Sequence, residues 1–185
     1  MRLFIAIELP EDVRQAIAKV QQQLQTSGAD ANWTRPEGIH LTLKFLGDVP
    51  EAKVAGVLQG MTDAAQGTGT LRFEVSGAGA FPSAKAPRVL WLGLTGDTAR
   101  LAALQRAVED AMDAAGFERE ERKFSPHLTL ARIRFPRPRD NWERRIEGIR
   151  DVRLGGFDAD RVSLMKSELH PGGAVYTEVG GVDLE

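Results

Sequence analysis

The sequence predicts an α+β fold, in which helices pack on antiparallel sheets around one core. The chain has 185 residues and is 42% hydrophobic, which is enough to bury a sizeable core. Short apolar runs alternate with stretches of helical periodicity, so both helices and strands are expected. Strand-like segments form hairpin-like pairs near the end of each half of the chain. Together these features favour helices packed on antiparallel sheets.

The chain also carries an internal repeat with a shift of 87 residues. The tetrapeptide HLTL occurs at 40–43 and again at 127–130. The aligned copies keep their register without a gap over about forty residues. Apolar positions coincide along this stretch, with Leu3, Ile5 and Ile7 falling on Leu90, Leu92 and Leu94. We interpret residues 1–185 as one domain made by duplication, with copies that start near residues 3 and 90.

Each copy is expected to open with a buried strand and continue with an amphipathic helix. The strands are predicted at 3–9 and 89–94, because these runs are short, apolar and well bounded. The helices follow Pro10 and Asp97, with apolar residues three or four positions apart. Gly116 is the expected stop of the second helix. The HLTL strand comes next in both copies.

Further elements are predicted downstream of these segments. Helical periodicity indicates two more helices, over 51–65 and 140–150. Alternation indicates three more strands, over 71–79, 160–169 and 174–179. Composition indicates a Gly/Pro/Ala-rich connection between the copies at 77–88 and a charged, proline-rich loop at 134–141.

Composition excludes several kinds of protein. There are no cysteines, which removes disulfides, thiolate nucleophiles and cysteine-based zinc sites. No apolar run approaches the roughly 18 residues of a membrane span. The first residues turn acidic too early for a secretory signal. We therefore expect a soluble, cytoplasmic protein without a membrane partner.

The charges are unevenly distributed. A net charge of −2 gives no overall attraction to nucleic acid. Residues 119–153 nevertheless hold eleven Lys or Arg against six Asp or Glu. Two interpretations stay open for this segment: an ordinary solvated surface, or a phosphate-attracting patch beside the second HLTL.

The HLTL strands place polar and apolar side chains on opposite faces. Side chains alternate along a strand, so His40 and Thr42 share one face while Leu41 and Leu43 fill the core from the other. The second motif repeats this arrangement. If the duplication is also a spatial pseudo-twofold, both motifs face one shared cleft.

Two imidazoles and two hydroxyl groups in one cleft suit phosphoryl transfer on a phosphodiester without a metal. Near neutral pH, one of His40 and His127 can act as an acid and the other as a base. The hydroxyl groups of Thr42 and Thr129 can donate hydrogen bonds to nonbridging oxygens. Alternatively, Leu-x-Leu drives strand formation and the polar residues take no part in chemistry. The third histidine, His170, falls in a predicted turn, where a surface position or a third metal ligand are the alternatives.

These motifs resemble the 2H phosphoesterase superfamily over essentially the whole chain. Besides the paired H-x-T-x motifs, the resemblance rests on RLFIAIELP, IHLTLKFLGD, FPSAKAPRVLWLGL, FSPHLTLARIR and SLMKSELHPGGAVYTEV. Within the superfamily, the chain is most similar to the bacterial and archaeal RNA 2′,3′-cyclic phosphodiesterases, first described as 2′–5′ RNA ligases.

The resemblance implies a fold and an activity. Two lobes related by a pseudo-twofold are expected, each an antiparallel sheet with outer helices, with a central groove between them. The implied reaction is hydrolysis of a terminal 2′,3′-cyclic phosphate on RNA, tRNA fragments included, to a 2′-phosphate, and some members join 2′–5′ ends in reverse. No metal or cofactor is implied, and a monomer is expected.

By matched position, the resemblance makes His40 the general acid and His127 the general base. Arg132 matches an arginine that the family uses near the phosphate. Phe45 stands at the same place in the first copy and could stack on a base, with core packing as its alternative. Strict alternation would turn both away from the histidine face, so each needs a bulge or a strand end. Three further residues are candidates for the groove, with a structural role as the alternative: Trp33, Arg35 and Tyr176.

Two rival functions stay open. One is a related activity on another cyclic phosphate, such as ADP-ribose 1″,2″-cyclic phosphate. The other is a non-catalytic module that binds RNA ends. Intact His and Thr in both motifs favour an enzyme over this second alternative.

Overall fold

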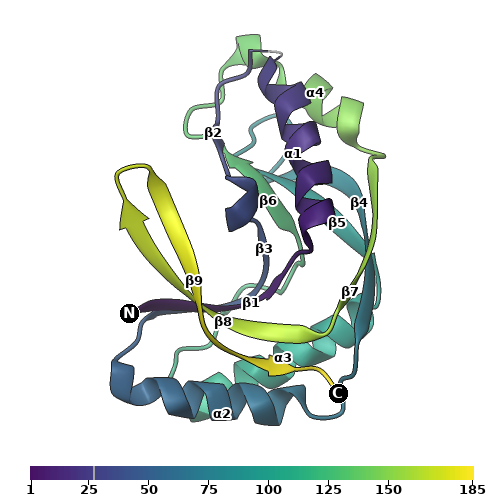
Figure 1. The fold of residues 1–185 in the computed structure, drawn as a ribbon. Coiled ribbons are helices and arrows are strands. Elements are labelled where there is room, and N and C mark those ends of the chain that lie inside the picture. The colour runs from purple at the N-terminus through teal and green to yellow at the C-terminus, as the bar shows by residue number, and fades with distance from the viewer. Residues whose placement is uncertain (27) are drawn as a thin grey trace.

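The computed structural model describes residues 1–26 and 28–185 (Figure 1). Three short 3-10 turns accompany the main elements: Pro36–Gly38, Glu51–Lys53 and Pro138–Asp140. In chain order the main elements are β1 (Arg2–Glu8), α1 (Glu11–Thr26), β2 (Asn32–Trp33), β3 (His40–Asp48), α2 (Val54–Ala65), β4 (Leu71–Phe81), β5 (Val89–Gly96), α3 (Thr98–Ala114), β6 (Leu128–Arg132), α4 (Trp142–Ile149), β7 (Arg153–Ala159), β8 (Arg161–His170) and β9 (Gly173–Asp183).

The strands form two sheets. Sheet A has four strands in the order β3-β1-β8-β9, and sheet B has five in the order β2-β6-β5-β4-β7. All the pairs in both sheets are antiparallel. The predicted α+β fold with antiparallel sheets is therefore confirmed.

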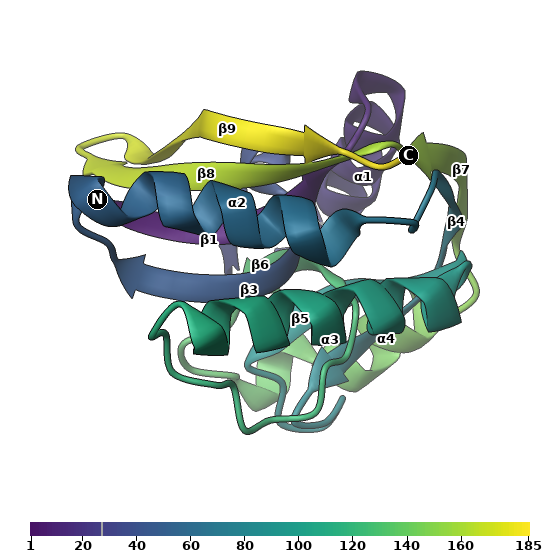
Figure 2. The same ribbon diagram turned by 90° about the horizontal axis from the view of Figure 1, so that it is seen from below.

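Both sheets combine strands from the two halves of the sequence. In sheet A, β1 of the first half pairs with β8 of the second half. In sheet B, β4 of the first half pairs with β5 of the second half. The helices cross over as well, since α1 follows β1 of sheet A but contacts β7 of sheet B, and α3 contacts β3. Helices α2 and α3 lie side by side across the two sheets (Figure 2). Each half therefore depends on the other for its partners.

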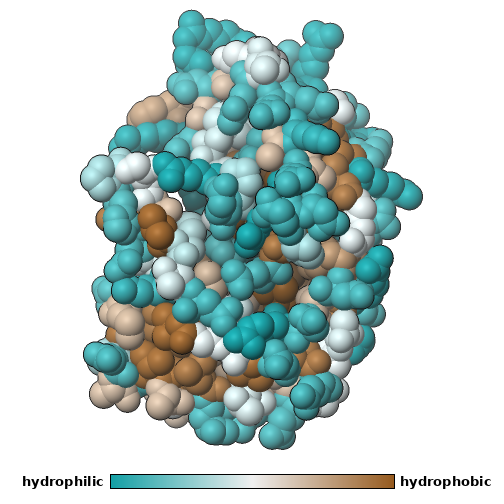
Figure 3. Space-filling view, viewed as in Figure 1, coloured by the Kyte–Doolittle hydropathy of each residue, from teal (hydrophilic) through white to brown (hydrophobic). Residues whose placement is uncertain are grey.

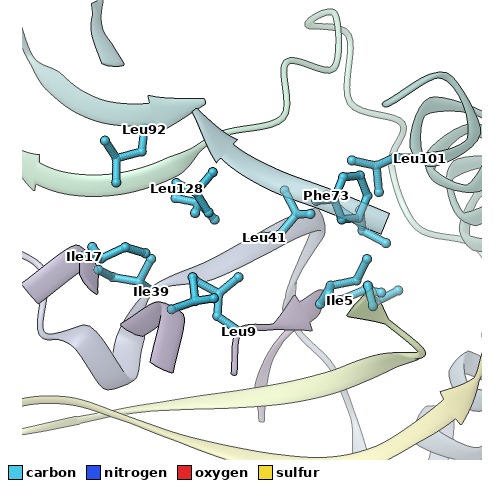
Figure 4. Close-up of a cluster of buried hydrophobic side chains, with 14 of the residues drawn as sticks. Ile5, Leu9, Ile17, Ile39, Leu41, Phe73, Leu92, Leu101 and Leu128 are labelled. Carbon is cyan, nitrogen blue, oxygen red and sulfur yellow. The ribbon is translucent and has the colours of Figure 1, made fainter. Parts of the chain in front are cut away.

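One hydrophobic core joins the two sheets. Figure 4 shows Leu41 of sheet A between Leu128 and Phe73 of sheet B, with Ile5 of sheet A on the side of Phe73 and Ile17 of α1 at the edge of the cluster. These side chains are almost completely buried, as the apolar spacing of the strands and helices predicts. A second, smaller cluster of Phe4, Ala6 and Met165 is separate from this core, and Tyr176 packs against it.

The predicted elements match the structure with a few differences. Strand β4 continues to Phe81, so the predicted connection over 77–88 is wrong in its first part. Gly77 has a φ of +80°, which allows the strand to bulge between Val75 and Ala78 and to continue. Strand β7 was not predicted, because its two central glycines interrupt the strand pattern. Among the described residues, no helix is long and apolar enough to cross a bilayer.

Candidate active site

His40 begins β3 and is held in a buried aromatic setting. Only 8% of its surface is exposed. Its ring makes edge contacts with the rings of Phe4, at 5.5 Å between centroids, and Tyr176, at 5.1 Å. Its Nδ1 lies 3.0 Å from the carbonyl oxygen of Gly38. A carbonyl can only accept, so Nδ1 carries a proton and Nε2 is the nitrogen that can exchange one.

His127 repeats this anchoring in a more open position. It lies one residue before β6, so the predicted strand over 127–130 begins at Leu128 instead. Its Nδ1 lies 2.7 Å from the carbonyl oxygen of Ser125, again two residues upstream. The ring of Phe81 stands at 88° to the imidazole, with centroids 5.1 Å apart. In both copies the same local hydrogen bond therefore directs proton exchange to Nε2.

The two motifs lie on strands that meet. Strands β3 and β6 belong to different sheets but contact each other near the middle of the molecule (Figure 1). Leu41 and Leu128 are fully buried, whereas Thr42 and Thr129 are half-buried, as the alternation predicts. The space-filling view shows a hollow between the projecting β8–β9 hairpin and the body of the molecule (Figure 3).

A β-bulge lies at the last residue of each motif. Strand β1 pairs Ala6 with Thr42 and then Ile5 with Lys44, so Leu43 is an extra residue. This bulge shifts the alternation by one position and brings Phe45 to the face of Phe4, with ring centroids 5.9 Å apart. Phe45 is 72% exposed, so its alternative role in core packing is wrong.

The second copy has the matching bulge. Strand β5 pairs Trp91 with Thr129 and then Leu90 with Ala131, so Leu130 is extra. Ala131 is consequently buried and Arg132 is exposed. The bulge that position +5 requires is thus present in both copies.

A buried ion pair lies beneath the first motif. Lys44 of β3 binds Glu109 of α3, and its Nζ also donates to the Glu118 carbonyl oxygen at 2.8 Å. The Glu109 carboxylate accepts the backbone N–H of Glu120 at 3.0 Å. The pair therefore ties β3 both to α3 and to the segment that leads to His127.

The remaining candidates have mainly structural contacts. Trp33 packs near Trp142, and the guanidinium of Arg35 lies against the turn of the β8–β9 hairpin. Tyr176 contacts the imidazole of His40, so it belongs to the site. Phe4 and Phe81 were missed, although Phe4 shares its repeat position with an aromatic residue in the second copy.

The alternative three-histidine metal site is not formed by the described residues. His170 is exposed, and its Nε2 lies 3.9 Å from the carboxylate of Glu168. Within residues 1–26 and 28–185, no three His, Asp or Glu side chains gather as metal ligands.

Burial lowers the pKa of the His40 imidazole to about 4, since the charged form would lose its hydration. The hydrogen bond to Gly38 opposes this effect, and the positive charge of Arg14 adds to it. In the free protein His40 is therefore neutral near pH 7.

This low pKa predicts a pH-dependent stability. The unfolded chain binds a proton at His40 below about pH 6.5, whereas the folded protein does so only near pH 4. The contribution is therefore complete above pH 6.5 and is lost as the pH falls. We expect the free energy of unfolding of wild type to drop by about 3 kcal/mol more than that of His40→Asn between pH 7 and pH 3. Urea titrations at several pH values measure it, with His170→Asn as control. Parallel curves for wild type and His40→Asn would contradict the prediction.

Comparison with known proteins agrees with this architecture. The model of the LigT-like phosphoesterase family matches the chain twice, over residues 7–91 and 92–176. An RNA 2′,3′-cyclic phosphodiesterase of Methanothermobacter thermautotrophicus is 35% identical over 97% of this chain and 96% of its own length. One of Thermotoga maritima is 36% identical over 95% of this chain and 91% of its own. The chain belongs to the LigT-like phosphoesterase family.

Solved structures show the same LigT-like fold. A crystal structure from Thermus thermophilus superposes with a TM-score of 0.80 at 30% identity, covering 100% of this chain and 98% of the other. Escherichia coli LigT complexed with 3′-AMP gives a TM-score of 0.77 at 25% identity, covering 99% and 97%. The predicted membership of the 2H phosphoesterases is confirmed, and the LigT-like family makes the chain a phosphoesterase.

Proposed function

We propose that this protein hydrolyses the 2′,3′-cyclic phosphate at RNA ends to a 2′-phosphomonoester, using His40 and His127 as a proton-exchanging pair. The observation that carries the proposal is the matched anchoring of the two imidazoles at the starts of two strands that contact each other. The family and the named activity of the two relatives support the choice of reaction.

The proposed reaction needs no group beyond these side chains and water. His127 removes a proton from water through Nε2 while the water oxygen bonds to phosphorus. The bond from phosphorus to the 3′ oxygen breaks, and His40 delivers a proton to that oxygen. Thr42 and Thr129 donate hydrogen bonds to the nonbridging oxygens. A 2′-phosphate and a free 3′ hydroxyl result, and the histidines exchange protons with solvent to reset.

The low pKa of His40 makes its acid role depend on the substrate. A neutral imidazole cannot donate the proton that the 3′ oxygen needs, so His40 must be protonated in the complex. An anionic phosphate beside the ring raises the pKa of that imidazole by Coulomb attraction. Substrate binding thus favours the protonated form of His40, which acts as the acid. The more exposed His127 serves as the base.

RNA is the proposed substrate because an exposed aromatic residue follows each motif and positive charge follows the second. Phe45 and Phe135 are large exposed aromatic residues, 72% and 74% accessible. The guanidinium of Arg134 lies 5.8 Å from the centre of the Phe135 ring. An open depression of about 380 Å³ beside this loop is lined in part by Lys85 and Arg137. Exposed aromatics among cations are typical of surfaces that bind single-stranded RNA.

Other parts of the proposal follow from the reaction. Joining of 2′–5′ ends is the same displacement at phosphorus: a 5′ hydroxyl attacks in place of water, the bond to the 3′ oxygen breaks, and a 2′–5′ phosphodiester results. Arg132 is proposed to bind the phosphate and Phe45 to stack on the terminal base. tRNA fragments are candidate substrates, and the protein is proposed to act as a cytoplasmic monomer, which gel filtration and fractionation can check.

Product analysis tests the function. Purified protein in EDTA should convert a short oligonucleotide with a 2′,3′-cyclic phosphate to the 2′-phosphate, since no metal takes part in the proposed reaction. Chromatography against 2′- and 3′-phosphate standards identifies the product.

Three outcomes would contradict the proposal. Activity abolished by EDTA and restored by a divalent cation would indicate metal-assisted hydrolysis. Turnover of ADP-ribose 1″,2″-cyclic phosphate alone would indicate a different substrate. Binding of the oligonucleotide without any product would indicate a non-catalytic module.

A further inference from the structure

The two bulges at the last residues of the HLTL motifs are each held by a buried glutamine. Gln21 of α1 is 4% exposed, and its side-chain amide donates to the carbonyl oxygens of Thr34, at 2.7 Å, and Leu130, at 3.0 Å. Leu130 is the extra residue of the β6 bulge. An amide nitrogen has two protons, so both donors of Gln21 are used on this bulge and on the strand end beside it.

Gln105 of α3 does the same for the first motif. Its amide donates to the carbonyl oxygen of Leu43, the extra residue of the β3 bulge, at 3.4 Å. It also donates to the Glu109 carboxylate at 3.2 Å. The arrangement is reciprocal, because each glutamine lies on a helix of one half of the sequence and holds the bulge of the other half.

A bulge interrupts the ladder and leaves its extra residue unpaired with the neighbouring strand. The Leu130 carbonyl already accepts the backbone N–H of Thr34 at 2.9 Å, and the Gln21 amide is its second donor. Each added hydrogen bond from a glutamine amide to a bulge carbonyl stabilises the bulged conformation. This conformation decides which face the later residues occupy, since a shift of one position turns each side chain to the opposite face. Arg132 and Phe45 lie two residues beyond the bulges, so the bulges determine which face their side chains occupy.

We infer that Gln21 and Gln105 are positioning residues, which hold the bulges so that Arg132 meets the substrate phosphate and Phe45 its base. The inference rests on the proposed function. Gln21 acts through Arg132, and Gln105 acts through Phe45. Neither glutamine touches the reacting atoms.

The test replaces Gln21 by Met, which keeps the length of the side chain but has no donor. Arg132 binds a charge that is present both before and during the reaction, so its loss should raise KM and leave kcat nearly unchanged. For Arg132→Ala we expect KM to rise about 10- to 100-fold, the usual worth of a hydrogen bond to a charged group. For Gln21→Met we expect about tenfold, again with kcat within about twofold. The control is Gln22→Met, an exposed neighbour on the same helix, which should match wild type.

Double variants separate positioning from general damage. The double variant Gln21→Met with Arg132→Ala should have the KM of Arg132→Ala alone. Gln21 affects KM only through Arg132, which this variant already lacks. Gln21→Met combined with Phe45→Ala should show the product of the two single effects. Partial unfolding would instead lower kcat with KM unchanged, and it would combine equally with both partners.

The inference is overturned by a Gln21→Met enzyme with wild-type KM, by a multiplicative effect with Arg132→Ala, or by an Arg132→Ala enzyme that behaves as wild type. If Gln21→Met is insoluble, Gln21→Asn is the second variant, since its shorter side chain withdraws the donor. The affinity of the same variants for 2′-AMP, measured by calorimetry, gives the same comparison without turnover. Wild-type protein that binds 2′-AMP but releases no product would defeat the proposed function, and the binding data would still decide the role of Gln21.

Discussion

His127→Ala is expected to lower kcat on a 2′,3′-cyclic phosphate oligonucleotide by about 10²- to 10⁴-fold, the usual worth of a general base. The Nδ1 of His127 is committed to the Ser125 carbonyl, so the variant loses the one nitrogen that can take a proton from water. Because the ring is partly exposed, its removal should leave the fold intact. Single-turnover rates, with thermal unfolding measured in parallel, give the comparison.

His40→Ala should lower kcat by a similar factor. In a plot of rate against pH, it should lose the limb that His127→Ala keeps. The matched control is His170→Ala, which removes an exposed histidine from the end of β8 and should keep the wild-type rate. Either catalytic variant within about tenfold of wild type would contradict the paired mechanism.

Lys44→Met is expected to lower the free energy of unfolding by about 3–5 kcal/mol, the cost of leaving one member of a buried ion pair alone. Glu109 would remain buried between β3 and α3 without its cation. Gln105 and the Glu120 N–H would still donate to the carboxylate, but neither carries a charge. Urea denaturation at pH 7 measures the change.

The double variant Lys44→Met with Glu109→Leu should recover most of that loss, because packed apolar side chains replace a buried pair at little net cost. Arg150→Met is the matched control. It breaks an exposed pair with Glu147 and should change stability by no more than about 1 kcal/mol. A Lys44→Met protein as stable as Arg150→Met would show that the buried pair contributes nothing.

The elements with strong periodicity were predicted from the sequence. Strands β1 and β5 and helices α1 and α3 match within a few residues, since each has one apolar face that must be buried. Strand β7 was not predicted, because its glycines carry no side chain to show an alternation. The strand predicted over 71–79 ends two residues before β4 does. The pairing of β7 with β4 decides that β7 is a strand.

The candidate site divides in the same way. The repeated HLTL alone identified His40 and His127, and the position of Phe45 and Arg132 in the motif raised the need for a bulge. Only the tertiary structure placed a bulge at both positions. The contact of Tyr176 with His40 depends on the pairing of β9 in sheet A, and no local pattern predicts it.

The sequence by itself determined the family, the paired motifs and most of the helices and strands, because these depend on residue type and on spacing within short segments. The tertiary structure decided which half supports which site. Gln21 and Gln105 are ordinary helix residues in the sequence, and their importance appears only where α1 and α3 cross to the other half. The lowered pKa of His40 likewise arises from burial by distant strands, and burial is a property of the assembled fold.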